Sequence, residues 1–246
     1  MHYQFERTYG CRVSDAWSYR GLKTVVLENE LLRVTVLADK GADVYEFIHK
    51  TTDTDCMWRT PWGVRDPRKF IPTTGSPEAI WQDVYEGGWQ TVAPTGGPCD
   101  YAGIEIGQHS EANLMPWDAQ ILEDSPDRVS ARFWVRTYRT PFFIEKTLSL
   151  ESGSPVLTVE ESVVNEANED ADCVWGQHIA LGSPFLSPES RLDIAGGDFL
   201  IPGEGDEETR RMKPDQTGTW PKAFAPNGTA VDLSEMPPMS AGVEDY

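Results

Sequence analysis

Several features that mark common protein classes are missing from this sequence. No run of 18 apolar residues occurs, so no transmembrane helix is predicted. The first residues, MHYQFERTYGCRVSDAW, carry charges and lack the apolar segment of a secretory signal, which favours a cytoplasmic location. There is no G-x-S-x-G elbow, no Walker loop, and no G-x-G-x-x-G after a strand. Serine-hydrolase, P-loop and dinucleotide-binding chemistry are therefore not indicated.

Basic residues are scarce. The 246 residues include 21 Lys and Arg against 40 Asp and Glu, which gives a net charge of −19. Such a chain repels phosphate, so we expect neither nucleic acid nor an anionic membrane as a partner. Because the acidic residues are spread along the chain, the composition favours adaptation to high salt, where self-repulsion is screened. An ordinary acidic protein is the alternative.

Cysteine is rare as well. The four cysteines, Cys11, Cys56, Cys99 and Cys173, are widely spaced and form no C-x-x-C pair. A zinc site or a redox pair therefore has no support. Without a secretory signal, we expect these thiols to be reduced and partly buried.

A helical period of 3.6 residues is almost absent, whereas alternation with period 2 dominates. Strand patterns are found in KTVVLENELLRVTVLADKGADVYEFIHK, TDCMWRTPWG, WDAQILED, RVSARFWVRTYRT, FFIEKTLSLES and PVLTVEESVVNEANED. In the fourth segment Val129, Ala131 and Phe133 alternate with Arg132 and Trp134, which indicates a half-buried strand. The pattern predicts an all-β fold, an antiparallel β-sandwich.

One segment, SPEAIWQDVYEGGW, carries the signals of a short helix. Ser76 can cap its start, and Pro77 fits its first turn. The pair Gly87-Gly88 can end it.

The last part of the chain differs from the rest. Residues 203–246 are dense in Gly, Pro and charge and show no sustained periodicity. We expect a single β-sandwich domain over residues 1–246, in which 203–246 is loop-rich and leads toward strands that the sequence does not contain.

The first candidate binding segment is YEGGWQTVAPTGG, residues 85–97. Its glycine pairs let the backbone turn tightly or approach a ligand. Trp89 and Gln90 offer an aromatic face and an amide. A Gly-rich connection with a core tryptophan is the competing interpretation.

The second candidate segment is GQHSEANLMPW, residues 107–117. On an extended backbone His109 and Glu111 would share a face, which suits general acid/base work. H-x-E also occurs in zinc deaminases, but their C-x-x-C partner is absent. A metal site formed by His109, Glu111 and His178 is the weaker alternative because it has only two histidines, so we expect no metal.

The third candidate segment is CVWGQHIALGSPF, residues 173–185. Alternation places Trp175 and Gln177 on one face and Gly176 and His178 on the other. The missing side chain at Gly176 leaves room beside the imidazole. A lone histidine at a strand end is more often structural. Tryptophan and amides beside two histidines, however, are groups that suit a sugar.

Taken in order, these segments resemble the galactose mutarotase-like superfamily, the relatives of aldose 1-epimerase. LENELLRVTVLADKGADVYEFIHK is similar to the family's opening strands, MWRTPWG to its LWRTP-like segment, and GGWQTVAPTGG follows. GQHSEANLMPW is similar to the family's His-Gly…Trp segment, and VWGQHIALGSPF to its second-histidine segment. The resemblance runs over residues 22–235 and points to a subgroup distinct from the well-studied mutarotases.

The resemblance implies a sandwich of the supersandwich type that holds a sugar on a concave face without a cofactor. His178 falls on the second-histidine motif and would protonate the ring oxygen as general acid. His109 falls on the first-histidine motif and would hold the ring oxygen or a neighbouring hydroxyl. The implied substrate-binding residues are Trp89, Gln90, Glu111, Trp175, Gln177 and Arg59.

One element of the family pattern is not matched. The family's general base is a glutamate on a late strand, and WPKAFAPNGTAVDLSEMPP…VEDY resembles the segment before that strand. We therefore expect the matching glutamate beyond Tyr246. Three explanations stay open: a truncated chain, a second polypeptide that completes the sandwich, or sugar binding without epimerisation. Missing strands would expose sheet edges, which a homo-oligomer would cover.

The sequence thus predicts an aldose 1-epimerase-like isomerase that interconverts the anomers of a small-molecule carbohydrate by acid/base ring opening. A non-catalytic carbohydrate-binding protein on the same fold is the first alternative, and a remnant with only a structural role is the second. The fold does not decide among them, because this superfold also carries lyase and hydrolase domains.

Overall fold

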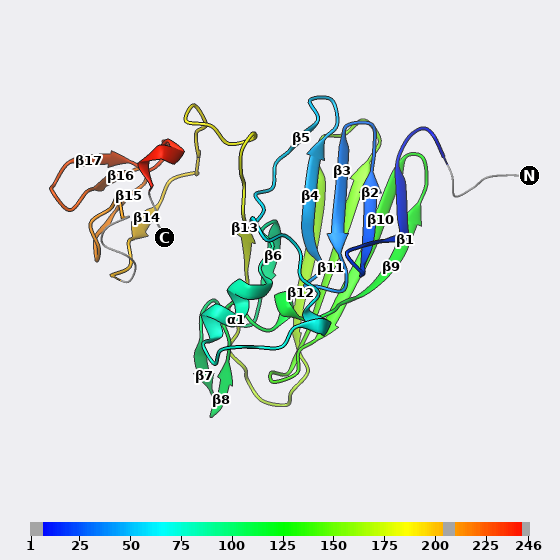
Figure 1. The fold of residues 1–246 in the computed structure, drawn as a ribbon, viewed down its shortest axis with the longest axis horizontal. Helices are drawn as coiled ribbons and strands as arrows, with labels where there is room; N and C mark the ends of the chain where they lie inside the picture. The colour runs from blue at the N-terminus through cyan, green and yellow to red at the C-terminus, as the bar shows by residue number, and fades with distance from the viewer. Residues whose placement is uncertain (1–6, 204–209, 243–246) are drawn as a thin grey trace, which may run out of the picture. The chain divides into compact units, whose positions relative to one another are not determined.

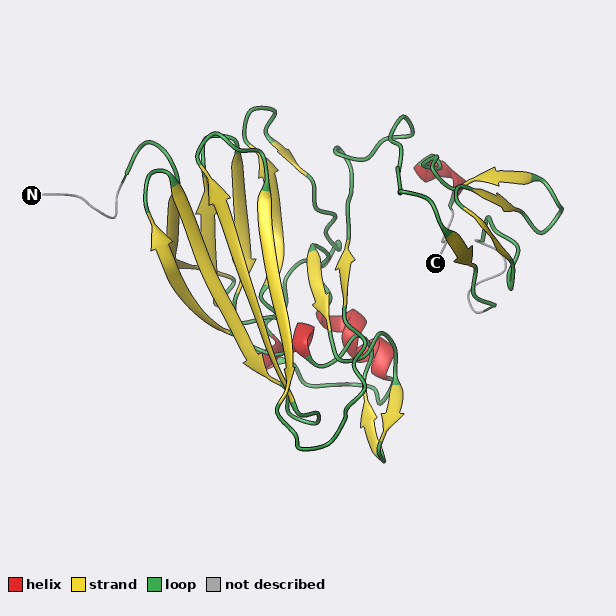
Figure 2. Ribbon diagram, turned by 180° about the vertical axis from the view of Figure 1, so that it is seen from behind, coloured by secondary structure: helices red, strands yellow, loops and turns green. Residues whose placement is uncertain are grey.

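A computed structural model describes residues 7–203 and 210–242. The chain divides into two compact units, Met1–Phe185 and Leu186–Tyr246. Antiparallel strands dominate both units, as Figure 1 and Figure 2 show. Within the described residues, no helix has the length and apolar character needed to cross a membrane.

The larger sheet of the first unit has the strand order β1-β2-β3-β4-β6-β13, with β5 paired to β4. All of its pairs are antiparallel. The segment 22–50, in which alternation predicts two or three strands, forms three consecutive strands, whereas β1 was not predicted. The strands are β1 (Arg12–Tyr19), β2 (Leu22–Glu28), β3 (Leu32–Leu37), β4 (Asp43–His49), β5 (Thr54–Asp55), β6 (Trp89–Val92) and β13 (Gly176–Ile179).

The second sheet has the order β12-β11-β10-β9 and is built from consecutive hairpins. The turns between its strands contain the SPD, TP and SGSP segments, whose residues favour tight turns. All four strands were predicted from alternation and are confirmed. They are β9 (Asp118–Asp124), β10 (Arg128–Arg136), β11 (Phe142–Glu151) and β12 (Leu157–Asn165).

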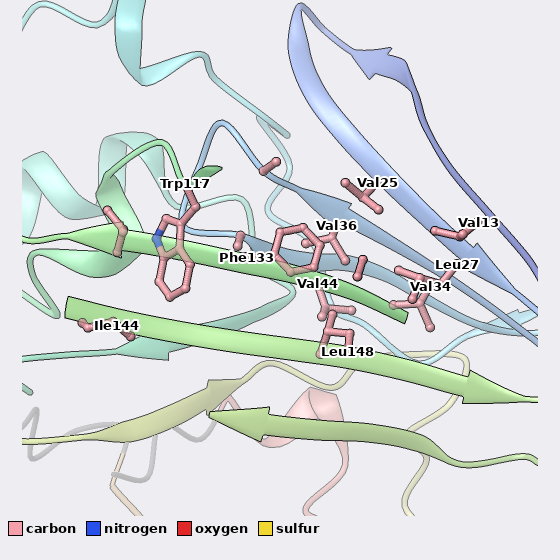
Figure 3. Close-up of a cluster of buried hydrophobic side chains, with 14 of the residues drawn as sticks. Val13, Val25, Leu27, Val34, Val36, Val44, Trp117, Phe133, Ile144 and Leu148 are labelled. Carbon is pink, nitrogen blue, oxygen red and sulfur yellow. The ribbon is translucent and has the colours of Figure 1, made fainter. Parts of the chain in front are cut away.

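The hydrophobic core lies between these two sheets. Side chains alternate along a strand, so each sheet gives one face to the core. In β10 the predicted apolar face, which includes Val129, Ala131 and Phe133, is buried. Figure 3 shows Phe133 of the second sheet beside Val36 of the first, and Leu148 of the second beside Val44 of the first. The all-β antiparallel sandwich predicted from the sequence is therefore confirmed.

The only α-helix among the described residues is α1 (Pro77–Val84). The Ser76 hydroxyl accepts a hydrogen bond from the backbone N–H of Ala79, and Pro77 occupies the first turn, as predicted. Trp81 and Val84 are its buried residues. The remaining short elements of this unit are η1 (Pro67–Lys69), η2 (Ala112–Leu114), and the hairpin of β7 (Cys99–Tyr101) and β8 (Ile104–Ile106).

The glycine pair after α1 brings the chain against the larger sheet. Gly87 and Gly88 both have positive φ, 90° and 76°. A Cβ at Gly87 would lie 2.2 Å from the Trp58 carbonyl oxygen, and one at Gly88 would lie 2.6 Å from that of Val44. The pair thus serves close backbone packing beside β4, and it positions the two residues that precede it, Tyr85 and Glu86.

The second unit contains two hairpins and a small core of Ile201, Met212 and Ala223. Each of its strands has three residues, in keeping with the weak periodicity of this region. Its elements are β14 (Asp198–Leu200), β15 (Thr217–Thr219), β16 (Lys222–Phe224), β17 (Ala230–Asp232) and η3 (Met239–Ala241). Residues 204–209 and 243–246 lie outside the described residues, and a single domain over 1–246 stays a prediction.

Candidate functional site

His178 lies on β13, at one end of the larger sheet. Its cross-strand partner on β6 is Gln90, so both side chains leave the same face of the sheet. On that face the Gln90 amide donates to Asp43 Oδ2 over 2.8 Å. The Tyr85 hydroxyl lies 3.4 Å from His178 Nδ1. We call this side of β6 and β13, defined by Asp43, Tyr85, Gln90 and His178, the histidine face.

The two histidines singled out in the sequence meet on the histidine face. Their ring centroids are 5.3 Å apart, although 68 residues separate them in the chain. The ring of Trp81 stands edge-on to both, at 4.8 Å from His109 and 5.8 Å from His178. Trp81 in turn stacks on Tyr85 at 4.5 Å. The helix α1 thus supplies an aromatic wall that fixes both imidazoles.

Burial disfavours the charged form of both imidazoles. Burial lowers the pKa of His178, and Asp43 opposes that shift. Burial and the neighbouring His178 lower the pKa of His109. The pKa of Tyr85 is raised far above its usual value, mainly by burial, so its hydroxyl keeps the proton. When this hydroxyl donates to Nδ1 of His178, the imidazole proton resides on Nε2, which can then act as a donor.

A cluster of buried charges lies beneath the histidine face. The ammonium of Lys40 is 2.7 Å from Asp43 Oδ2 and 3.0 Å from Glu86 Oε2, and all three side chains are almost fully buried. The Asn113 amide donates to Gln90 Oε1 over 3.3 Å and extends the network. This cluster was not predicted, because Lys40 lies in the segment DKGAD, which has the composition of a solvated turn.

The structure corrects the role expected for Gln90. Its side chain is fully buried and is held between Asp43 and Asn113. It therefore lies behind His178 and supports the strand pair, and it is not placed to touch a substrate.

Glu111 also differs from expectation. Its buried carboxylate accepts hydrogen bonds from the backbone N–H groups of Tyr138 and Arg139 and from the hydroxyl of Thr140, at 2.9, 2.8 and 2.8 Å. The backbone is not extended here, because His109 has a φ of 48° and Glu111 is in the α region. Glu111 thus anchors the loop that carries His109 to the turn between β10 and β11.

This arrangement bears on the metal site formed by His109, Glu111 and His178 that the sequence left as the weaker alternative. The carboxylate of Glu111 is already taken up by the turn and is not available to a metal beside the two histidines. Across the described ranges, no group of three or more His, Cys, Asp or Glu is placed to hold a metal ion.

Three further predicted residues lie on the opposite side of β6 and β13. The Trp89 indole N–H donates to Gln177 Oε1 over 2.6 Å. Glu161 of β12 accepts from the Gln177 amide at 2.6 Å and from the Trp175 indole at 2.9 Å. We call this side, defined by Trp89, Trp175, Gln177 and Glu161, the tryptophan face. The alternation predicted for Trp175, Gln177 and His178 is confirmed, but it splits the predicted residues between two faces.

Arg59 packs its guanidinium 4.3 Å from the centre of the Tyr45 ring. It also pairs with Asp55 and Glu46. The adjacent Trp58 is 41% exposed, and its ring lies 6.1 Å from that of Tyr85. Trp58, which was not among the predicted residues, is thus an exposed aromatic side chain beside the aromatic wall of the histidine face.

A separate cavity of about 410 Å³ contains none of the predicted site residues. Its lining includes Cys99 and Cys173, which are exposed, whereas Cys11 and Cys56 are buried. The expectation of partly buried thiols is therefore wrong for Cys99 and Cys173, which lie in loop and hairpin segments outside the sandwich core.

Comparison with known proteins identifies a family. Residues 19–229 match the model of the family described as Domain of unknown function (DUF4432). No curated protein matches the sequence.

Two solved structures share the fold. One is a protein from Klebsiella pneumoniae subsp. pneumoniae that is provisionally named an aldose 1-epimerase, with a TM-score of 0.57 at 16% identity over 78% of this chain. The other is a galactose mutarotase-like protein from Clostridium acetobutylicum, with a TM-score of 0.52 at 16% identity over 79% of this chain. This chain spans 50% of the first protein and 61% of the second.

Proposed function

The chain belongs to the DUF4432 family and has the galactose mutarotase-like fold, and on that premise we propose that it is an aldose 1-epimerase-like isomerase. Its substrate is a small-molecule carbohydrate of the cytoplasm, whose anomers it interconverts by acid/base ring opening. The observation that carries the proposal is the pair of imidazoles, His109 and His178, whose ring centroids lie 5.3 Å apart beside one aromatic wall and whose pKa values are both lowered. Pairs of titratable groups with shifted pKa values are typical of acid/base sites.

His178 acts as the general acid in this proposal. In its protonated form His178 donates the Nε2 proton to the ring oxygen of the sugar and becomes neutral, while a base removes the proton of the anomeric hydroxyl. The bond between the anomeric carbon and the ring oxygen breaks, and an open-chain aldehyde and a hydroxyl form. After rotation about the neighbouring carbon–carbon bond, that hydroxyl attacks the other face of the carbonyl. The hydroxyl proton returns to His178 and the base gives its proton to the former carbonyl oxygen, so the cycle leaves the enzyme unchanged.

His109 and Trp58 position the sugar. His109 holds the ring oxygen or a neighbouring hydroxyl, since a neutral imidazole both donates and accepts hydrogen bonds. Trp58, whose ring is partly exposed beside Tyr85, offers an apolar face on which sugar C–H groups can stack. The family's late glutamate is the expected base for the anomeric proton.

A carbohydrate-binding protein without catalysis is the second candidate. It is favoured by one observation: within residues 7–203 and 210–242, neither imidazole hydrogen-bonds a carboxylate. The carboxylates of Asp43 and Glu86 are buried below the site and already pair with Lys40. On this alternative, sugars bind saturably but their anomers interconvert at the spontaneous rate.

Polarimetry of a freshly dissolved aldose separates the two candidates. An isomerase accelerates the approach to anomeric equilibrium in proportion to protein concentration, and His178→Ala abolishes the acceleration. Equal rates for wild type and His178→Ala would rule out the proposed chemistry. Saturable sugar binding, measured on the same samples by calorimetry, would then support the binding protein.

A further inference from the structure

Three ionisable side chains are buried together under the histidine face. The exposed fractions of the Lys40, Asp43 and Glu86 side chains are 1%, 0% and 1%. Removing charges from water costs several kcal/mol per ion, and apolar residues of similar size often give equal or greater stability. A cluster of this kind is therefore better explained by what it does to its neighbours than by its contribution to the fold.

The cluster is electrically balanced through a proton on Glu86. Burial raises the pKa of Glu86 to about 8, and Asp43 adds to that shift. Burial alone would lower the pKa of Lys40, but Asp43 and Glu86 outweigh it and raise the pKa. With a proton on Glu86, the ammonium of Lys40 is balanced by a single carboxylate, and the cluster has no net charge.

Two buried oxygens support this assignment of the proton. Asp43 Oδ1 and Glu86 Oε1 receive no hydrogen bond from any N–H or hydroxyl group among the described residues. A proton on Glu86 supplies the missing donor, since the neutral carboxyl can hydrogen-bond Asp43. A buried acceptor without a donor costs about 1–3 kcal/mol, so the proton is favoured by geometry as well as by burial.

The cluster is connected to His178 by two routes. Gln90 donates to Asp43 Oδ2 over 2.8 Å and pairs with His178 across the strands. Tyr85, which precedes Glu86 in the chain, contacts Nδ1 of His178 at 3.4 Å. Electrostatically, Asp43 favours the protonated form of His178 and Lys40 disfavours it. The other titratable groups that face His178 are His109 and Tyr85.

We propose that Lys40, Asp43 and Glu86 are the charge-balancing partners of His178. With its proton, Glu86 leaves the cluster neutral and the imidazole uncharged at rest. When Glu86 releases that proton to solvent as the pH rises, the cluster gains a negative charge below His178 and the proton affinity of His178 increases. These are positioning residues, because they act on His178 and not on the sugar.

This role rests on the proposed function, in which His178 alternately gives and takes a proton. A half-buried imidazole resists charging unless an anion lies near it. Asp43 is that anion, and Lys40 balances its charge, so the imidazole can both take up a proton and give it away.

The test is NMR titration of the His178 ring in wild type, Glu86→Gln and Glu161→Gln. Glutamine has the shape of a neutral glutamic acid, so Glu86→Gln keeps the resting arrangement but cannot ionise. We expect a second inflection near pH 8 in the wild-type His178 signal, and its loss in Glu86→Gln. Glu161→Gln is the matched control on the tryptophan face and should titrate like wild type. An inflection near pH 8 that survives in Glu86→Gln would overturn the proposal.

A second variant tests the sign of the effect. Lys40→Met removes the cation that disfavours the imidazolium, so the proton affinity of His178 should rise about tenfold, which is one pKa unit. An unchanged titration in folded Lys40→Met contradicts the proposal, and if this variant does not fold, Glu86→Gln decides alone. Neither readout requires catalysis, so failure of the isomerase proposal in polarimetry is distinguishable from failure of this one.

Discussion

The two faces of the strand pair β6 and β13 use similar residues in opposite ways. On the tryptophan face, the polar atoms of Trp89, Trp175 and Gln177 are bonded to one another and to Glu161. On the histidine face, by contrast, His109 Nδ1 is buried and has no partner among the described residues. Both faces contain aromatic rings and amides. Only the histidine face combines them with shifted pKa values and unpaired polar atoms, which are marks of function.

Substitutions of two neighbouring residues of β13 should show the largest difference between the two faces. His178→Ala should lower the rate of anomer interconversion by about 10²- to 10⁴-fold, the range typical of a lost general acid. Gln177→Ala, one residue away on the tryptophan face, should change the rate less than about twofold. Polarimetry of both variants checks this. Equal losses in the two would mean that the faces do not differ in function.

Loss of Glu111 should have the next largest effect. Glu111→Ala leaves two backbone N–H groups and the Thr140 hydroxyl without their acceptor, which should lower the free energy of unfolding by about 3 kcal/mol. Urea denaturation measures this. Glu105→Ala, which removes an exposed carboxylate from β8 in the same region, should stay within about 0.5 kcal/mol of wild type. Equal stability of Glu111→Ala and wild type would remove the anchoring role.

Tryptophan substitutions should distinguish the faces by sugar affinity. Trp58→Ala should raise the dissociation constant for an aldose about tenfold, in line with about 1 kcal/mol for one lost aromatic contact. Trp175→Ala should leave it nearly unchanged, although Trp175 is the more exposed ring at 49% against 41%. Isothermal titration calorimetry gives both values. The reverse order would place the sugar on the tryptophan face.

A smaller effect is expected from the titration of Glu86, which should change the stability of the protein with pH. Its pKa is raised to about 8, so the stability linked to its proton is fully present below pH 4.5 and is lost as the pH rises toward 8. Glu86→Gln does not titrate. The free energy of unfolding of Glu86→Gln minus that of wild type should therefore be larger at pH 9 than at pH 4, by at least about 1 kcal/mol. Urea denaturation at both pH values measures this difference between variant and wild type. The same difference at pH 4 and pH 9 would contradict a raised pKa for Glu86.

Alternation alone was enough to predict most of the sandwich. In β10 the residues with period 2 are those that fill the core, because packing between two sheets requires one apolar face per strand. The first strand was missed because most of Arg12–Tyr19 is exposed at a sheet edge, so its sequence shows no clean alternation.

The site was predicted less completely, for a physical reason. The segment order placed His109 and His178 together, and the structure brings their rings within 5.3 Å. Alternation also placed Trp175 opposite His178. The side chains that cover the two faces come from β12 on the tryptophan face and from α1 on the histidine face, and both elements lie outside the segment that forms β13. The burial of Lys40 likewise depends on Glu86, which lies 46 residues later in the chain.

The central claim is that a sugar binds at the histidine face. It is tested most directly by following the NMR signals of the imidazole rings and indole N–H groups while an aldose is added. The chain has four histidines and nine tryptophans, so variants can assign each signal. We predict that the ring signals of His109 and His178 shift saturably with sugar, while the indole N–H signal of Trp175 keeps its position. A saturable shift of the Trp175 indole with unchanged His109 and His178 signals would contradict the account.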